Sequence, residues 1–232
     1  MSNPVDKSLQ NPWKNLSPKP PYVLAEDMSI IERSRHAKEL RIDTLPDPFV
    51  GGLDSAEVIF LALNPGFIDS DIELNLKMPE FLEANRTNLN DPYSSPFYYF
   101  SGSFEETGGH IWWERKLKPL LQAGITESVL REKIMLIEYL GYHSKNADKI
   151  KGLKVPSQHF SFNLVREAIS RQKTIVIMRS KKLWLEAVPE LDAYPYMTLN
   201  SSLNVTISPK NIGEANFEII LKKLTNKEPR EN

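Results

Sequence analysis

The sequence predicts a three-layer αβα domain with a central, mostly parallel sheet of four strands. Short apolar runs alternate along the chain with longer segments whose apolar residues have helical spacing. This order is typical of a sheet covered by helices on both faces. Hydrophobic residues make up 41% of the 232 positions, enough for one sizeable core, and no internal repeat is visible.

The chain divides into a lead-in segment and one domain. Residues 1–22 are polar and rich in proline, so we expect an extended arm. Residues 23–232 carry the alternating pattern and are expected to form a single domain.

The expected strands are short apolar runs that end at turn residues. The first, at 58–63, is apolar without a break, as is typical of a central strand covered on both faces. Further strands are expected at 133–143, 174–178 and 196–200. Loops rich in turn residues are expected at 45–57, 90–109 and 201–211.

The longer segments have apolar residues three or four positions apart. Phe162, Val165 and Ile169, for example, share one face of a helix. Gly124 marks the end of another helix. Helices are expected at 28–40, 73–85, 111–124, 156–172, 179–188 and 212–224.

The composition excludes several chemistries. The chain has no cysteine, which excludes disulfides, iron–sulfur clusters and thiol catalysis. Its four histidines are scattered and form no zinc motif, so we expect no metal and no cofactor. No apolar run approaches the ~20 residues of a membrane span, and the first residues lack the apolar core of a signal peptide. We therefore expect a cytoplasmic monomer without a membrane partner.

The stretch LALNPGF, at 61–67, marks the first candidate site. Pro65 cannot donate to a strand ladder, and Gly66 permits close backbone approach. Asn64 is thus held at the carboxyl end of a central strand, where ligands bind in open α/β sheets. The alternative is a plain strand-to-loop turn, because Asn, Pro and Gly are common turn residues.

Polar side chains also follow the second and fourth expected strands. Glu138, Tyr139 and His143 end the second, and Asn200 ends the fourth, before Ser201 and Ser202. If these strands are parallel neighbours, their ends converge with Asn64 on one rim. A lone histidine is, however, more often structural than catalytic.

An aromatic run lies in the loop between the first two strands. Phe97, Tyr98, Tyr99 and Phe100 are consecutive there. Aromatic rings beside a polar rim suit a planar ligand, stacked by a ring and recognised along its edge. Packing within the loop is the alternative.

The order of these pieces resembles the uracil-DNA glycosylase superfamily. Its mismatch-specific and single-strand-selective branches carry a G-x-N-P-G motif, matched here by 62–66 with Ala62 in place of the first glycine. Their second strand ends in a base-reading residue, usually Asn, where this chain has Glu138. Their last motif is His or Asn before a Ser-containing loop that wedges into DNA, similar to 200–204 without the common proline. The segment at 109–126 also resembles a helix of the mismatch branch, and the likeness extends from about residue 45 to 222.

This resemblance implies a monofunctional DNA glycosylase, which flips a base out of DNA and hydrolyses its N-glycosidic bond without a cofactor. It implies that Asn64 orients the attacking water, because an amide positions a water but does not take up its proton. The implied catalytic residues are Asn64, Asn200 and His143. The implied base-binding residues are Glu138, Phe67, Tyr98, Phe100 and Tyr139. The implied DNA contacts are Ser201, Ser202, Leu203, Lys181, Lys182 and Lys210.

Glu138 is the departure that bears on the substrate. An ionised carboxylate only accepts hydrogen bonds, and its natural partner is an exocyclic amine such as that of cytosine. Some bacterial members of the superfamily remove glucosylated hydroxymethylcytosine from phage DNA. Glu138 and the long stretch at 67–96 fit such an enlarged cytosine. The alternatives are that Glu138 pairs with a lysine or caps a helix, that the enzyme repairs uracil or mismatches, or that the chain binds nucleic acid without catalysis.

Local cations must serve DNA binding, because the net charge is only −1. Basic residues follow the expected strands, although exposed lysines are usually just a solvated surface. They are Lys145, Lys149, Lys151, Lys154, Arg179, Lys181, Lys182 and Lys210.

Overall fold

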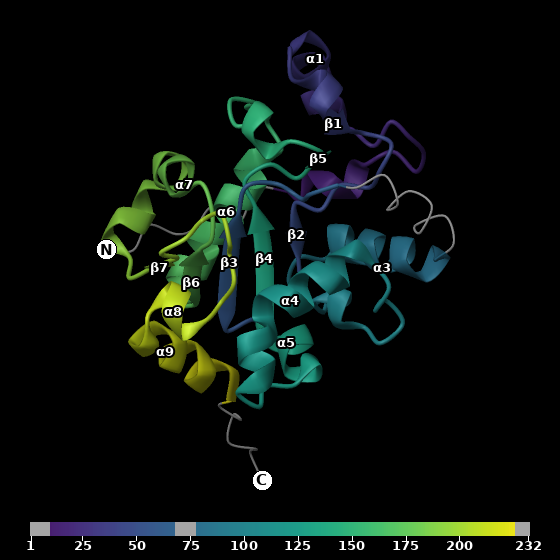
Figure 1. Cartoon of the computed structure of the whole chain (residues 1–232). Helices are drawn as coiled ribbons and strands as arrows, with labels where there is room; N and C mark the ends of the chain where they lie inside the picture. The colour runs from purple at the N-terminus through teal and green to yellow at the C-terminus, as the bar shows by residue number, and fades with distance from the viewer. Residues whose placement is uncertain (1–9, 68–77, 226–232) are drawn as a thin grey trace.

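The centre of the protein is a mixed five-stranded sheet (Figure 1). The computed structural model describes residues 10–67 and 78–225. Four strands are parallel to one another, and β2 at one edge is antiparallel to its neighbour. In spatial order the strands are β2 (Phe49–Val50), β4 (Ile134–Glu138), β3 (Val58–Ala62), β6 (Thr174–Ile177) and β7 (Met197–Thr198).

The α/β class and the mostly parallel sheet are thus confirmed, but the expected number of strands was too low. The additional strand, β2, lies in 45–57, where turn residues predicted a loop. It has only two residues, both buried, so it is too short to show a periodic pattern.

Helices formed largely where their apolar spacing predicted them. The helix expected at 28–40 ends at Arg33, and a helix at 127–133 was not expected; Thr126 caps it by accepting the amide hydrogen of Val129. The α-helices are α1 (Ala25–Arg33), α3 (Pro79–Asn90), α4 (Gly108–Gln122), α5 (Glu127–Lys133), α6 (Gln158–Ser170), α7 (Lys181–Ala187), α8 (Pro209–Ile212) and α9 (Glu214–Thr225).

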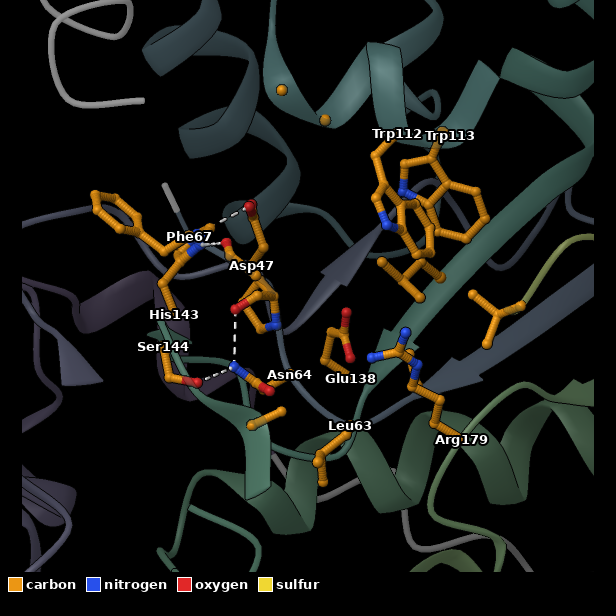
Figure 2. A pocket seen from close by; sticks show the side chains of 18 of the residues that line it. Asp47, Leu63, Asn64, Phe67, Trp112, Trp113, Glu138, His143, Ser144 and Arg179 are labelled. Carbon is orange, nitrogen blue, oxygen red and sulfur yellow. Dashed lines mark hydrogen bonds and ion pairs between the residues drawn. The ribbon is translucent and has the colours of Figure 1, made fainter. Parts of the chain in front are cut away.

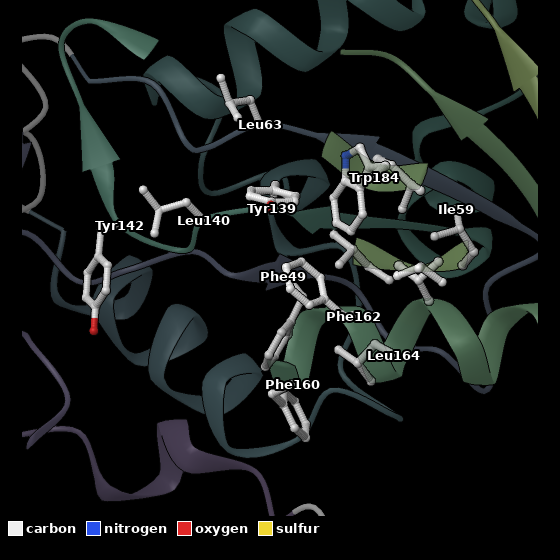
Figure 3. Close-up of a cluster of buried hydrophobic side chains, with 14 of the residues drawn as sticks. Phe49, Ile59, Leu63, Tyr139, Leu140, Tyr142, Phe160, Phe162, Leu164 and Trp184 are labelled. Atoms are coloured by element: carbon white, nitrogen blue, oxygen red, sulfur yellow. The ribbon is translucent and has the colours of Figure 1, made fainter. Parts of the chain in front are cut away.

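Alternate side chains of β3 enter two separate cores, which explains the three layers. Ile59 and Leu61 pack in one cluster with residues of α6 and α7 (Figure 3). Val58 and Phe60 pack in the other with residues of α4, α5 and α9. Because both faces of β3 are covered, its unbroken apolar sequence is what the architecture requires.

The order of connections places a ligand site at the carboxyl ends of the parallel strands. The chain passes from β3 to β4 on one side, then returns across β3 to β6 and β7. Open α/β sheets bind ligands at such a reversal. β3 and β4 end level with each other, because Ala62 pairs with Glu138.

A second, two-stranded sheet lies beside this rim. Its strands, β1 (Leu40–Arg41) and β5 (His143–Ser144), are antiparallel. Five short 3-10 helices complete the described elements: η1 (Pro12–Asn15), η2 (Ala37–Glu39), η3 (Tyr98–Phe100), η4 (Ala147–Lys149) and η5 (Pro189–Ala193).

The described part of the lead-in segment packs on the domain. Trp13 is 2% exposed and meets the ring of Tyr142 edge-on at 5.6 Å. Asn11 Nδ2 donates a hydrogen bond to the carbonyl oxygen of Leu89 at 2.7 Å. In the long stretch at 67–96, residues 68–77 lie outside the described residues. Within the described ranges, no helix combines the length and apolar character that crossing a membrane requires.

Candidate functional site

A cavity of about 850 Å³ opens at the carboxyl ends of β3, β4 and β6. Figure 2 shows its side chains in two groups, one around Asn64 and one around Glu138. The principal polar residues of its lining are Asp47, Asn64, Glu138, His143, Ser144 and Arg179. The structure therefore brings together the predicted ends of the first, second and third strands.

The amide of Asn64 has a fixed orientation. Its Nδ2 donates to Pro65 O at 2.8 Å and Ser144 Oγ at 2.9 Å, and it lies 3.4 Å from Tyr142 O (Figure 2). These acceptors identify the nitrogen end of the amide. Oδ1 has no hydrogen-bond partner among the described residues, so it is available to a water or ligand.

His143 lines the cavity with both ring nitrogens directed at protein oxygens. Nδ1 lies 2.7 Å from Gly66 O and therefore carries a proton, since a carbonyl oxygen only accepts. Nε2 lies 3.1 Å from Oδ2 of Asp47, an ion-pair contact without the alignment of a straight hydrogen bond. His143 thus ties the turn after β3 to Asp47.

Asp47 is a site residue that the sequence analysis missed. Its buried carboxylate accepts hydrogen bonds from Tyr98 Oη at 2.5 Å, Tyr99 Oη at 2.9 Å and Asn85 Nδ2, in addition to the contact with His143. Burial, followed by the charge of Asp47, raises the pKa of both tyrosines well above its usual value, so they remain donors at neutral pH. Three hydrogen bonds and the contact with His143 together satisfy this buried carboxylate.

Glu138, unlike Asp47, has a buried carboxyl oxygen to which no described residue donates a hydrogen bond. It is 4% exposed, and its Oε2 has no hydrogen-bond partner in the described part of the chain. Burial, and then the charge of Asp47, raise the pKa of Glu138 well above its usual value, while Arg179 opposes this. The neutral acid is favoured and can both donate and accept. This corrects the expectation of an ionised Glu138 that only accepts.

Phe67 lies at the cavity as expected. Its ring meets His143 edge-on at 6.1 Å, and the guanidinium of Arg41 lies 4.2 Å from its centroid. The ring therefore has one face toward a cation and one edge toward the network of Asp47.

The other aromatic predictions differ from the structure. Tyr98, Phe100 and Tyr139 are buried outside the cavity lining. Tyr139 packs against Trp184 on the opposite face of the sheet (Figure 3). Tyr99 lines the cavity instead, because η3 turns successive side chains in different directions.

The loop at 201–206 reaches the cavity only in part. Ser202 and Leu203 line it, and Leu203 is 92% exposed. Ser201 and Asn200 do not; the side chain of Asn200 donates to Lys210 O at 3.1 Å. The predicted catalytic position of Asn200 is therefore not reproduced.

Asn211, which the sequence analysis missed, holds this loop together. Its Nδ2 donates to Asn204 O at 2.7 Å and Thr206 O at 2.9 Å. Its Oδ1 accepts from the amide nitrogen of Ser201 at 2.8 Å. The exposed Leu203 consequently stands at the apex of a fastened loop.

Five of the eight basic residues that were predicted to contact DNA do not line the cavity. Lys181, Lys182 and Lys210 are exposed, and Lys182 is 3.8 Å from Glu186. None of the three lines the cavity, nor do Lys149 and Lys154. The cations that do line it are Arg115, Lys145, Lys151 and Arg179.

Neither a cluster of metal ligands nor a similar known protein identifies what the cavity binds. Across residues 10–67 and 78–225, no three His, Asp or Glu side chains gather as metal ligands. Comparisons with family models, with curated proteins and with solved structures gave no match to this chain. Inferences about its function therefore depend on the geometry of the site and on the motifs of the sequence.

Proposed function

We propose that this protein is a monofunctional DNA glycosylase with a uracil-DNA glycosylase-like fold, acting as a cytoplasmic monomer on DNA. The observation that carries the proposal is Asn64, whose amide is locked by its acceptors while its carbonyl oxygen remains available in the cavity. The resemblance of LALNPGF and of the loop after Asn200 to that superfamily supports it.

In the proposed reaction, Asn64 Oδ1 holds a water against the anomeric carbon of a flipped nucleotide. The bond from C1′ to the base breaks through an oxocarbenium-like sugar. The water oxygen bonds to C1′, and the base leaves with the electron pair and takes up a proton. Because an amide is not a base near neutrality, Asn64 contributes position and electrostatic stabilisation.

The departing base would lie against Glu138, with the charge of Arg179 nearby. Both project from strand ends into the same cavity (Figure 2). The cation of Arg179 and the O–H of a neutral Glu138 are suited to the negative charge that develops on the leaving base. His143 acts through position, since both its ring nitrogens already face Gly66 and Asp47.

The size of the cavity favours a modified base. Ligand pockets typically have ~300–1,000 Å³, and this one, at about 850 Å³, is large for a single unmodified pyrimidine. A neutral carboxyl complements the edges of both cytosine and uracil, so Glu138 alone does not separate them. We therefore propose a modified cytosine, such as glucosylated hydroxymethylcytosine in phage DNA, and a role in anti-phage defence.

The position of Leu203 supports the proposal that the protein flips a base. An exposed leucine on a fastened loop at the cavity mouth has the position of an apolar wedge. Such wedges enter the base stack and stabilise an extruded nucleotide.

Two observations favour other candidates. Asn200 lies outside the cavity lining, which favours a catalytically silent nucleic-acid-binding protein on the same fold. The raised pKa of Glu138 favours a repair glycosylase for uracil or mismatches, because the neutral acid can donate to a carbonyl.

The test is incubation of the full chain with single-stranded and duplex DNAs carrying uracil, mismatched bases or modified cytosines, followed by alkaline cleavage. Strand breaks at the modified cytosine, absent with Asn64→Ala, are expected. Breaks only at uracil or a mismatch would assign the repair activity. DNA binding without breaks on any substrate would assign the silent candidate.

A further inference from the structure

Three cations gather at one side of the cavity mouth. Arg115 and Lys116 belong to α4, and Arg179 follows β6. Arg115 and Arg179 line the cavity, whereas Lys116 is 8% exposed and is not part of the lining. Burial, and then the charges of Arg115 and Arg179, lower the pKa of Lys116, as expected where like charges lie close together.

These cations lack the carboxylate partners found elsewhere in the molecule. Arg41, Arg166 and Arg171 each lie within 3.0 Å of a carboxylate oxygen. Among the described residues, neither Arg115, Lys116 nor Arg179 has an ion pair within 4.0 Å. Like charges without a counter-charge are unfavourable, so a ligand that brings negative charge is the natural complement.

Two of these cations have N–H donors that no group among the described residues takes up. Nε of Arg179 is buried and has no hydrogen-bond partner within the described ranges. Nζ of Lys116 donates to Asn204 Oδ1 at 3.0 Å and has two further hydrogens. The nearby carboxyls do not neutralise them: Glu138 favours its neutral form, and Asp148 pairs with Lys151 at 2.5 Å.

We propose that Arg115, Lys116 and Arg179 form a binding site for a phosphate group of the ligand. A phosphate presents several acceptor oxygens, and arginine binds it in bidentate fashion. The contact between Lys116 and Asn204 joins this site to the loop of Leu203, so a bound phosphate would hold the strand beside the proposed wedge. The choice of phosphate rests on the proposed function, which makes the ligand a nucleotide.

The test measures binding, independently of base removal. Fluorescence anisotropy of a labelled single-stranded oligonucleotide would follow affinity against salt for the parent, Arg115→Gln, Arg179→Gln and Lys118→Gln. Lys118 is an exposed cation of the same helix outside the cavity lining, so its variant is the matched control. Each arginine variant should bind about tenfold more weakly or worse. Each should also lose about 0.7 from the slope of log K against log salt, which is one phosphate contact.

Two further measurements show whether the phosphate belongs to DNA or to a free nucleotide. An oligonucleotide with one neutral methylphosphonate linkage beside the target base should bind parent and Arg179→Gln equally if the phosphate belongs to DNA. If a nucleoside monophosphate instead raises the melting temperature of the parent but not of Arg179→Gln, the site takes a free nucleotide. Arg179→Lys keeps the charge without the bidentate geometry and should be intermediate.

Arginine variants that bind like Lys118→Gln, with equal salt slopes, would overturn the phosphate site. Circular dichroism melting checks that all variants are folded. If the parent removes no base from any DNA but the arginine variants still bind more weakly with a smaller salt slope, the glycosylase proposal is refuted and the phosphate site is retained.

Discussion

The two sides of the cavity differ in how their polar groups are satisfied. The bonded wall, defined as Asp47, Asn64, His143 and Ser144, is held by hydrogen bonds and by the contact of His143 Nε2 with Asp47 Oδ2. The open wall, defined as Arg115, Lys116, Glu138 and Arg179, contains a buried oxygen and a buried nitrogen without partners. Figure 2 shows part of each wall facing the other across the cavity.

This difference separates positioning from recognition. Satisfied polar groups are held rigidly, whereas a buried group without a partner costs about 1–3 kcal/mol until a ligand satisfies it. The bonded wall is therefore suited to fixing one atom, Oδ1 of Asn64. The open wall is suited to gaining hydrogen bonds only when the ligand enters.

The largest expected effect is on stability, at the bonded wall. Asp47→Ala leaves His143, Tyr98, Tyr99 and Asn85 without their shared acceptor. Each buried donor that loses its acceptor costs about 1–3 kcal/mol, and urea denaturation would measure the summed loss. Asp43→Ala, at an exposed pair, is the control and should cost at most about 1 kcal/mol. Equal losses would show that the network does not support the wall.

The second effect is on catalysis. Asn64→Ala should lower the rate of base removal about a hundredfold, as for the loss of one preorganised polar group. DNA affinity should persist, because the cations proposed to bind phosphate lie on the open wall and not beside Asn64. Ser144→Ala removes one of the acceptors that hold Asn64 and should reduce the rate less. An Asn64→Ala variant with the parental rate would remove Asn64 from the mechanism.

The third effect separates flipping from chemistry. Leu203→Ala should slow base removal from duplex DNA about tenfold, since unstacking costs a few kcal/mol. Single-stranded DNA needs no wedge, so its rate should be unchanged. Ile219→Ala, an exposed apolar residue on α9, is the control. A parallel loss on both substrates would show that Leu203 acts otherwise.

The smallest effect on base removal is expected from Glu138→Gln, because an amide reproduces the donor and acceptor of the neutral acid. Its pH dependence is more informative. Because the folded-state pKa of Glu138 is raised, the folded protein keeps a proton that the unfolded chain releases. Stability is then lost as pH rises above the unfolded pKa of ~4.3.

The stability of Glu138→Gln relative to the parent should therefore grow as the pH rises above about 4. Urea denaturation across that range measures the difference, in which groups common to both proteins cancel. A difference that does not change with pH would mean that Glu138 titrates normally.

The sequence was most informative where a long apolar pattern fixes the backbone. The unbroken run at 58–63 predicted a central strand, and Asn64 and Glu138 followed as neighbours at the same edge. Asn64 and Glu138 lie at the same edge because their strands pair in parallel. Strands whose residues are all apolar, without polar residues at alternate positions, already indicate such pairing. The polar ends of the first two strands were thus predictable together.

The remaining site residues depend on contacts that short patterns do not encode. Asp47 lies in a proline-flanked loop, and its three hydrogen-bond donors and its contact with His143 are all distant in the sequence. The choice of Tyr99 over Tyr98 depends on the turn of η3. Asn200 was expected in the cavity from its strand end, but β7 stops two residues earlier and its side chain bonds to Lys210 O instead.

The small sheet of β1 and β5 has a consequence for how this protein can diverge. Ser144 of β5 accepts a hydrogen bond from Asn64, and its backbone pairs with Gly66. The turn after β3 is therefore held by the small sheet and not by the main one. The cations of the open wall are carried by α4 and the end of β6 instead. Substitutions at these cations can therefore change which ligand the cavity holds while the bonds that orient Asn64 stay in place.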